Sequence, residues 1–168
     1  DSKAFSVVRL SKIYRQAESS HIVLNAHKIN AGELITLDNK NKDFFFFEKK
    51  DVRSVMGALV YLVKTRLPEY IGASPFEIQV LTPMRKGELG VEHLNEVLQY
   101  YLNPASESKK EKEGRTGVFR EGDKVMQVKN NYKLEWKITN AKGFSIEEGL
   151  GVFNGDMGII KQINTYSE

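Results

Sequence analysis

Four consecutive phenylalanines in the stretch DFFFFEKK, residues 43–50, constrain the fold of this chain more than any other feature. Successive side chains of a strand point to opposite faces, so this run is apolar on both faces. Such a pattern is typical of a strand in a parallel sheet that helices cover on both sides. An exposed edge strand and a docking patch are the alternatives, and the pattern favours the buried strand.

Strand-like and helix-like segments alternate before Pro104. Short apolar stretches indicate strands, and apolar side chains at helical spacing indicate helices. This alternation predicts an α/β fold, a parallel sheet with flanking helices, in which ligands bind at the carboxyl ends of the strands. The expected strands are residues 5–10, 43–50 and 76–83, and the expected helices are residues 17–32, 51–67 and 90–104.

Local signals set the ends of these helices. Ser19 or Ser20 is expected to cap the first helix, and Gly32 is expected to end it. Asp51 is expected to cap the second helix, which should end before Pro68 because proline cannot continue the hydrogen-bond pattern.

The character of the sequence changes at Pro104. Residues 104–117 are charged and have no apolar periodicity, which is typical of an exposed, mobile linker. Beyond them, alternating residues indicate strands, and the pair Asn154-Gly155 is a strong turn signal. A small β unit is therefore predicted. Residues 133–150 within it resist assignment because they are long for a hairpin loop.

Composition excludes several kinds of site. The chain has no cysteine and three scattered histidines, so disulfides, thiolate metal sites and a catalytic zinc site are not expected. A net charge of +3 neither requires nor excludes nucleic-acid binding. No Gly-x-x-x-x-Gly-Lys-Ser/Thr or Gly-x-Gly-x-x-Gly motif is present, so this chain is not expected to hold a nucleotide by itself. No stretch resembles a membrane span or a signal peptide, and the lack of cysteine is consistent with the cytoplasm.

Arg15 follows the first expected strand in the stretch KIYRQAESS. Its guanidinium would lie at the ligand-binding end of the sheet, where it can reach the γ-phosphate of a nucleotide held by a neighbouring domain. The alternative is a surface salt bridge to Glu18 or another nearby acid. The pattern alone favours the salt bridge.

Two other stretches carry candidate anion contacts. In TPMRKGELG, Arg85 and Lys86 lie close to the expected helix start at Gly90, an arrangement that suits a phosphodiester. A solvated loop is an equal alternative. In KNNYK, amides and cations surround Tyr132, which can stack on a base, although a polar turn is favoured there. Lys124 is ambiguous in the same way.

Four stretches, in this order, resemble the RecD-like helicases of superfamily 1, also known as the exodeoxyribonuclease V alpha subunit family: RLSKIYRQAESSHIVLNAHKINAG, VLTPMRKGELGVEHLNEVLQYYLNP, FREGDKVMQVKNNY and GVFNGDMGII. The resemblance covers nearly the whole chain. It implies a piece of a longer protein, whose other domains are missing. Residues 1–103 would be the opening part of the second RecA-like domain, and residues 118–168 an inserted SH3-like β-barrel segment.

The resemblance also implies roles for single residues. Arg15 would be an arginine finger that reaches the γ-phosphate of ATP on the first RecA-like domain, with Tyr14 and Gln16 beside the nucleotide. The resemblance thereby reverses the preference for a salt bridge that the pattern alone gave for Arg15. Gly122 and Gly155 would be turn residues. The residues implied to bind single-stranded DNA are Thr82, Pro83, Met84, Arg85, Lys86, Gly87, Asn130, Asn131 and Tyr132.

The resulting functional prediction is a part of an ATP-dependent DNA helicase of DNA repair and recombination. ATP and Mg²⁺ would be held mainly by the missing domain, so this chain alone is expected to be inactive. The expected partners are single-stranded DNA, the first RecA-like domain and, without a firm assignment, helicase–nuclease subunits; no membrane is expected. The alternative is a non-enzymatic nucleic-acid or protein binding module with an SH3-like appendage. A free-standing α/β enzyme is disfavoured, because no nucleophile–base or paired-carboxylate set is present.

Overall fold

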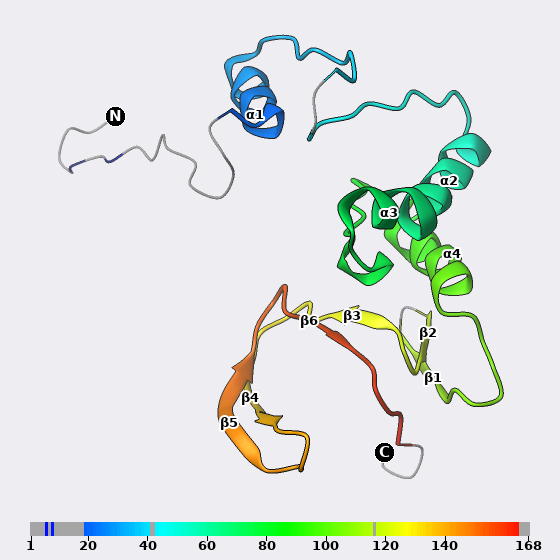
Figure 1. Ribbon diagram of the computed structural model, residues 1–168, viewed down its shortest axis with the longest axis vertical. Helices are drawn as coiled ribbons and strands as arrows, with labels where there is room; N and C mark the ends of the chain where they lie inside the picture. The colour runs from blue at the N-terminus through cyan, green and yellow to red at the C-terminus, as the bar shows by residue number, and fades with distance from the viewer. Residues whose placement is uncertain (1–5, 7, 9–18, 41–42, 116, 165–168) are drawn as a thin grey trace. The chain divides into compact units, whose positions relative to one another are not determined.

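The computed structural model describes residues 6, 8, 19–40, 43–115 and 117–164. The chain forms two compact units, Asp1–Lys49 and Lys50–Glu168, each of which is described by itself. Unit 1 contains helix α1, and unit 2 contains the other helices and all the strands of the described residues (Figure 1). None of the described helices has the length and apolar character that a membrane span requires.

Helix α1 (His21–Ala31) is fixed at its start by a side chain from farther along the chain. The Asp43 carboxylate accepts from the His21 N–H at 3.1 and 3.2 Å. Ser20 occupies the N-cap position as predicted, but its side chain makes no hydrogen bond to the helix. The predicted stop at Gly32 is confirmed, because this residue adopts a left-handed φ of 77°.

The four phenylalanines do not form the predicted strand. Residues 44–49 pair with no strand among the described residues. The Asn39 side chain instead binds the Phe46 backbone, donating to its carbonyl at 2.8 Å and accepting from its N–H at 2.6 Å. Phe47 is 59% exposed. A strand buried in a sheet also needs cover on both faces, whereas Phe45 and Phe46 are each 42% exposed.

Unit 2 begins with a long helical segment that contains a π-helical turn. Asp51 caps its start as predicted, accepting from the Ser54 N–H at 2.9 Å. The segment continues past Pro68, where it was expected to end. The π turn changes the hydrogen-bond register, so Pro68 falls in the first turn of the next α-helix, where its missing N–H costs no hydrogen bond. The three parts are α2 (Val52–Tyr61), η1 (Leu62–Arg66) and α3 (Leu67–Ile71).

The strand predicted at residues 76–83 is also absent. A short 3-10 helix, η2 (Pro75–Glu77), occupies its start. The Ser74 hydroxyl accepts from the Phe76 N–H, and the Glu77 carboxylate accepts from the Ser74 N–H at 2.7 Å. This capping box stabilises a helical turn, and the rest of the stretch finds no strand partner among the described residues.

Helix α4 (Val91–Leu102) is the predicted third helix of the sequence. Leu94 is its most buried apolar side chain, at 4% exposed. The predicted buried stripe is only partly covered, because Val91 and Tyr101 are 43% and 44% exposed. Asn103 ends the helix, directly before Pro104.

The strands after α4 form the predicted small β unit, and all pairings among the described residues are antiparallel. Part of the stretch predicted as a mobile linker is a strand, because pairing with its neighbour satisfies its backbone hydrogen bonds. The pairs are β1 (Glu111–Gly114) with β2 (Gly117–Arg120), β3 (Lys124–Met126) with β6 (Met157–Ile159), and β4 (Asn131–Thr139) with β5 (Ser145–Val152).

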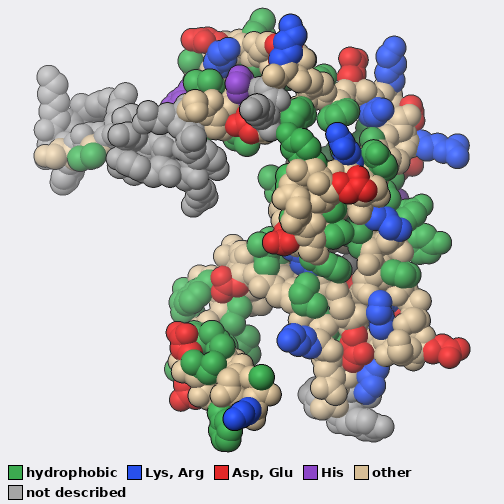
Figure 2. Space-filling view, in the orientation of Figure 1, with side chains coloured by type: hydrophobic (Ala, Val, Ile, Leu, Met, Phe, Trp, Pro, Cys, Tyr) green, Lys and Arg blue, Asp and Glu red, His purple; other side chains and the backbone are tan. Residues whose placement is uncertain are grey.

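The β4–β5 hairpin occupies the stretch that the sequence left unassigned. Every residue of β4 is exposed. The Trp136 ring lies against Gly149 of the partner strand, where a Cβ atom would lie 2.6 Å from the Trp136 Cζ2 atom. Figure 2 shows apolar side chains exposed over this hairpin, at the lower left of the view. The hairpin is therefore a ribbon with few side chains covered on either face.

The predicted turn at Asn154-Gly155 is confirmed. Gly155 adopts a φ of 97°, and the Asp156 N–H donates to the Phe153 carbonyl at 3.0 Å. The turn connects β5 to β6, which belong to different sheets. The Gly155 N–H also donates to the Gln127 carbonyl at 2.8 Å, so the turn closes against the end of β3.

Candidate nucleic-acid interface

The arginine finger predicted at Arg15, with its neighbours Tyr14 and Gln16, lies outside the described residues. Its role stays a prediction. Farther along unit 1, Asn25 is 5% exposed, whereas His27 is exposed. The Asn25 side chain therefore faces the interior of unit 1, and His27 faces solvent.

The loop that leads into α4 is a compact turn. The Thr82 hydroxyl donates to the Leu89 carbonyl at 2.7 Å, which joins the two ends of the loop. Gly87 adopts a φ of 94°. At Gly90, a Cβ atom would lie 2.5 Å from the Lys86 carbonyl carbon, so only glycine fits without moving the backbone. The sequence thus fixes the shape of the loop and the position of its basic side chains.

The N-terminus of α4 is closed by the loop itself. The Val91 N–H donates to the Met84 carbonyl at 3.0 Å, and the Glu92 N–H donates to the Arg85 carbonyl at 3.2 Å. These are two of the N–H groups that a helix leaves free at its start. The prediction that free N–H groups at this helix start bind an anion is therefore wrong for Val91 and Glu92, because carbonyls of the same loop already accept from both.

The basic side chains of the loop remain accessible. Arg85 Nε lies 3.0 Å from Glu92 Oε1, and the Arg85 side chain is 75% exposed. Exposed ion pairs contribute only about 0–1 kcal/mol, so a phosphate can compete with Glu92 for this guanidinium. Lys86 is exposed and has no partner among the described residues. Electrostatic contact with a polyanion is thus available through side chains and not through the helix backbone.

The predicted contacts of the β unit are partly engaged within the protein. Asn130 Nδ2 donates to the Tyr132 hydroxyl at 3.0 Å, and Asn130 Oδ1 accepts from the Asn154 N–H at 2.8 Å. Tyr132 is 67% exposed and packs edge-on against Phe153, with ring centroids 5.8 Å apart. Asn131 Oδ1 accepts from the Lys133 N–H at 3.2 Å. The two asparagines therefore support the local backbone, and Tyr132 offers the accessible ring.

Lys124 is directed toward the protein. Its Nζ atom donates to the Ile78 carbonyl at 3.2 Å and to Gln79 Oε1 at 3.3 Å. The side chain thus connects β3 to the segment before the basic loop. This contact resolves the ambiguity of Lys124 in favour of a structural role.

A buried polar cluster surrounds Asp123, which the sequence patterns did not predict. This carboxylate is 9% exposed and accepts from Gln99 Nε2 at 2.6 Å, from Asn103 Nδ2 at 2.7 Å and from the Arg120 N–H at 2.7 Å. Two of the donors lie at the end of α4 and the third lies in β2. Gly122 adopts a φ of 92° as predicted for a turn, and a Cβ there would lie 3.1 Å from Asn103 Oδ1. The cluster joins α4 to the β unit.

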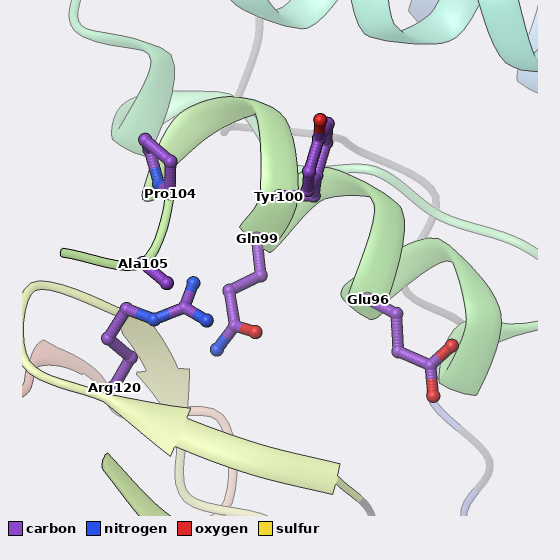
Figure 3. A pocket seen from close by; sticks show the side chains of 6 residues that line it. All are labelled: Glu96, Gln99, Tyr100, Pro104, Ala105 and Arg120. Atoms are coloured by element: carbon purple, nitrogen blue, oxygen red, sulfur yellow. The ribbon is translucent and has the colours of Figure 1, made fainter.

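A pocket of about 360 Å³ lies beside this cluster, between α4 and β2 (Figure 3). Arg120 points into it, and its guanidinium binds Glu111 Oε1 at 2.6 Å and the Asn103 carbonyl at 2.5 Å. Gln99 also donates internally, and Glu96 points away from Arg120. Because Arg120 and Gln99 are both engaged in contacts within the protein, we regard the pocket as part of the joint. Its lining residues are Glu96, Gln99, Tyr100, Pro104, Ala105 and Arg120.

Glu121 ties the two ends of the β unit together. Its carboxylate accepts from the Ile163 N–H at 2.8 Å and from the Lys110 N–H at 3.2 Å. These two hydrogen bonds hold the pKa of Glu121 below its ordinary value of 4.5. Among the described residues, no group of three or more acidic or histidine side chains is placed to hold a metal ion.

Comparison with known proteins identifies the class of this β unit. Residues 94–168 match the family described as the ATP-dependent RecD-like DNA helicase SH3 domain. The match begins at Leu94, inside α4, so it includes Gln99 and Asn103, which bind Asp123. The β unit and the end of α4 are thus an SH3-like domain of the RecD-like helicase type.

A curated relative extends the match over almost the whole chain. The chain is 30% identical to the ATP-dependent RecD2 DNA helicase of Deinococcus radiodurans over 159 residues, which are 95% of this chain and 18% of the relative. The chain is therefore a part of a RecD-like helicase that includes the SH3 domain. It spans about a fifth of the length of the curated relative that it matches.

Proposed function

We propose that this chain is the section of an ATP-dependent DNA helicase that supplies an arginine finger and part of the single-stranded DNA track. The observation that carries the proposal is the match to a RecD2 helicase over 95% of the chain, with the basic loop of residues 82–90 held in a fixed shape. In the whole protein, closure of a nucleotide cleft would move the DNA track along one strand.

Arg15 is the proposed finger. A guanidinium that reaches the γ-phosphate stabilises the charge of the transition state, and removal of such a finger typically costs on the order of a thousandfold or more in turnover. Tyr14 and Gln16 would lie beside the same nucleotide. ATP and Mg²⁺ would be held by another domain, in keeping with the lack of a phosphate-binding loop in this sequence.

Arg85 and Lys86 are the proposed contacts to the DNA backbone. Their side chains are exposed, and the loop below them is fixed by Thr82 and Gly90. Phosphate contacts of this kind position a strand without reading its sequence. Tyr132 would add a stacking surface for a base, which is also insensitive to sequence.

The stretches at residues 44–49 and 76–83 are proposed as strands of a RecA-like parallel sheet in the whole protein. The support is the run of four phenylalanines in the first stretch, which suits burial on two faces, and the alternating apolar residues Ile78 and Val80 of the second. Neighbouring strands from the rest of the domain would supply the missing backbone hydrogen bonds.

Two measurements on the whole helicase test the function. Arg15→Ala is expected to reduce DNA-stimulated ATP turnover sharply while single-strand binding stays within about twofold, because the finger acts on transition-state charge. The matched control is Arg53→Ala, which removes an exposed arginine of α2. Unchanged turnover in Arg15→Ala would exclude Arg15 as the arginine finger. Magnesium-dependent ATP turnover by the 168-residue chain alone would exclude the proposal that another domain holds ATP and Mg²⁺.

A further inference from the structure

The two basic side chains of the loop before α4 differ in their surroundings. Arg85 Nε lies 3.0 Å from Glu92 Oε1, and no other hydrogen bond or ion pair engages this guanidinium among the described residues. Lys86 is exposed and has no partner in the same part of the chain. One cation of the loop is thus already paired with a carboxylate, whereas the other is available to a ligand.

The ion pair between Arg85 and Glu92 is not needed for the shape of the loop. The Glu92 N–H donates to the Arg85 carbonyl at 3.2 Å, and the Val91 N–H donates to the Met84 carbonyl at 3.0 Å. The Thr82 hydroxyl joins the two ends of the loop. These contacts hold both residues of the pair in place whether or not their side chains touch. The guanidinium can therefore leave Glu92 without distorting the loop.

Separation of the pair also costs little free energy. The Arg85 and Glu92 side chains are 75% and 36% exposed, so water solvates both charges once they separate. Glu92 lies in the first turn of α4, where the helix dipole favours a carboxylate even without a cation beside it. A phosphate offers Arg85 a charge-assisted hydrogen bond of the same kind. The phosphate and Glu92 therefore compete for one guanidinium on similar terms.

The charge of the loop gives this competition an effect on binding. Residues 82–92 contain two basic and two acidic side chains, so they carry no net charge. The second acidic side chain, Glu88, is exposed and makes no ion pair within the described chain. Attraction of a polyanion to the loop thus depends on which cation is available at short range. Lys86 is available before a strand arrives, whereas Arg85 becomes available only when it leaves Glu92.

Two other roles for Glu92 lead to different expectations. A salt bridge that only supports α4 would affect strand binding through charge repulsion alone. A carboxylate that orients Arg85 toward the strand would make binding weaker when it is removed. The contact runs through Nε alone, so it does not fix the guanidinium as a bidentate pair would. The geometry therefore favours competition over orientation.

We propose that Glu92 is an internal competitor of the DNA backbone, whose carboxylate holds Arg85 in the absence of a strand and takes it back when the strand leaves. Lys86 is then the constant contact of the loop, and Arg85 is a conditional one. This inference rests on the proposed contact of Arg85 and Lys86 with single-stranded DNA. It adds a device that limits how long the loop holds a phosphate, which suits a protein that must release the strand in order to move along it.

A double-mutant cycle in the whole helicase separates competition from general charge repulsion. Binding of fluorescent oligothymidylate is measured by anisotropy at low ionic strength, because salt screens exposed ion pairs. Glu92→Gln is expected to tighten binding by a factor about three times larger with Arg85 present than in Arg85→Ala, since only the former has a pair to break. In Lys86→Ala, Glu92→Gln is expected to act as it does in the wild type.

Glu88→Gln is the matched control, because it removes an unpaired carboxylate from the same loop. Its effect on binding is expected to be equal with and without Arg85. Glu92→Ala is expected to tighten binding as Glu92→Gln does. Dissociation into excess unlabelled oligothymidylate is expected to slow in Glu92→Gln by about the factor that its affinity gains, because affinity changes within one interface lie mainly in the dissociation rate.

The possible outcomes distinguish this inference from the proposed function. Weaker binding in both Glu92 variants would show that the carboxylate orients Arg85 or supports the loop, and would overturn the proposal. If Arg85→Ala weakens binding but Glu92→Gln acts equally with and without Arg85, the DNA contact stands and the competition is overturned. If Arg85→Ala changes binding in neither background, the DNA contact itself is excluded, and the competition is excluded with it.

Discussion

The Asp123 carboxylate accepts a hydrogen bond from Asn103 Nδ2 at 2.7 Å and so connects the β unit to the end of α4. Both residues are buried, at 9% and 5% exposed. The contact places a carboxylate inside the protein with its hydrogen-bond donors supplied by side chains and backbone on both sides of the joint. Removing one of those donors leaves the carboxylate partly unsatisfied.

Asn103→Ala is therefore expected to lower the free energy of unfolding of unit 2 by about 2 kcal/mol, because it removes a hydrogen bond to a buried charged group. Urea denaturation followed by Trp136 fluorescence measures this change. Asn30→Ala removes the same side chain from an exposed position of α1 and serves as the control. A loss below about 0.5 kcal/mol in Asn103→Ala would mean that the joint does not depend on this bond.

Gly90→Ala is expected to distort the basic loop. The added Cβ would lie 2.5–2.7 Å from backbone atoms of Arg85 and Lys86, which cannot move aside as a flexible side chain would. The expected loss is about 1–3 kcal/mol of stability, as for overpacked sites. Gly57→Ala is the matched control in α2. A Cβ there meets nothing within 4 Å, so a gain of about 0.5–1 kcal/mol is expected. Equal effects of the two substitutions in thermal unfolding would contradict the assigned role of Gly90.

Stability is expected to fall with acid partly through Glu121. Its folded pKa lies below the ordinary value of 4.5 because the Ile163 and Lys110 N–H groups stabilise the carboxylate. The folded state therefore binds this proton less readily than the unfolded state. The stabilisation is complete above the unfolded pKa and is lost as the pH falls through the folded pKa. Urea midpoints measured from pH 6 down to acid conditions should fall less steeply for Glu121→Gln than for the wild type. Parallel profiles would show that Glu121 makes no contribution.

Arg85→Ala combined with Lys86→Ala is expected to weaken binding of oligothymidylate. Each phosphate contact to a single strand adds about 0.7 to the slope of log K against log salt, so the slope should drop by about 1.4. Fluorescence anisotropy at several salt concentrations gives both quantities. Lys50→Ala with Arg53→Ala removes the same two charges from exposed positions at the start of α2 and controls for net charge. An equal loss in the control pair would mean that the basic loop is not a specific contact.

The sequence predicted those features that depend on a few adjacent residues. Gly32, Asp51 and the Asn154-Gly155 turn act through their own backbone geometry or through a side chain within one helical turn. The strand expected at residues 43–50 does not form, because a strand needs partners, which no local pattern supplies. The contact of Asp43 with the start of α1 was not predicted for a related reason, since Asp43 is remote in sequence from His21.

The candidate site shows the same limit. The basic side chains of Arg85 and Lys86 were visible in the sequence, but the Met84 and Arg85 carbonyls that occupy the start of α4 were not. The contact between Asn103 and Asp123 spans twenty positions, and neither residue is unusual in its own neighbourhood. Polar residues at an element boundary, such as Asn103 before Pro104, were the available signal for this joint.

The chain crosses from β3 toward the hairpin at Gln127 and returns at Asp156, and these two points are bonded to each other. The Gln127 N–H donates to the Asp156 carbonyl at 2.8 Å, and the Gln127 carbonyl accepts from the Gly155 N–H at 2.8 Å. The β4–β5 hairpin lies between these two points, and the hydrogen bonds that join them involve no residue of its strands. Over evolutionary time the hairpin can lengthen, shorten or be exchanged while the SH3-like domain beneath it keeps its shape. Relatives of this chain are expected to differ in length at this point more than at any other point of the domain.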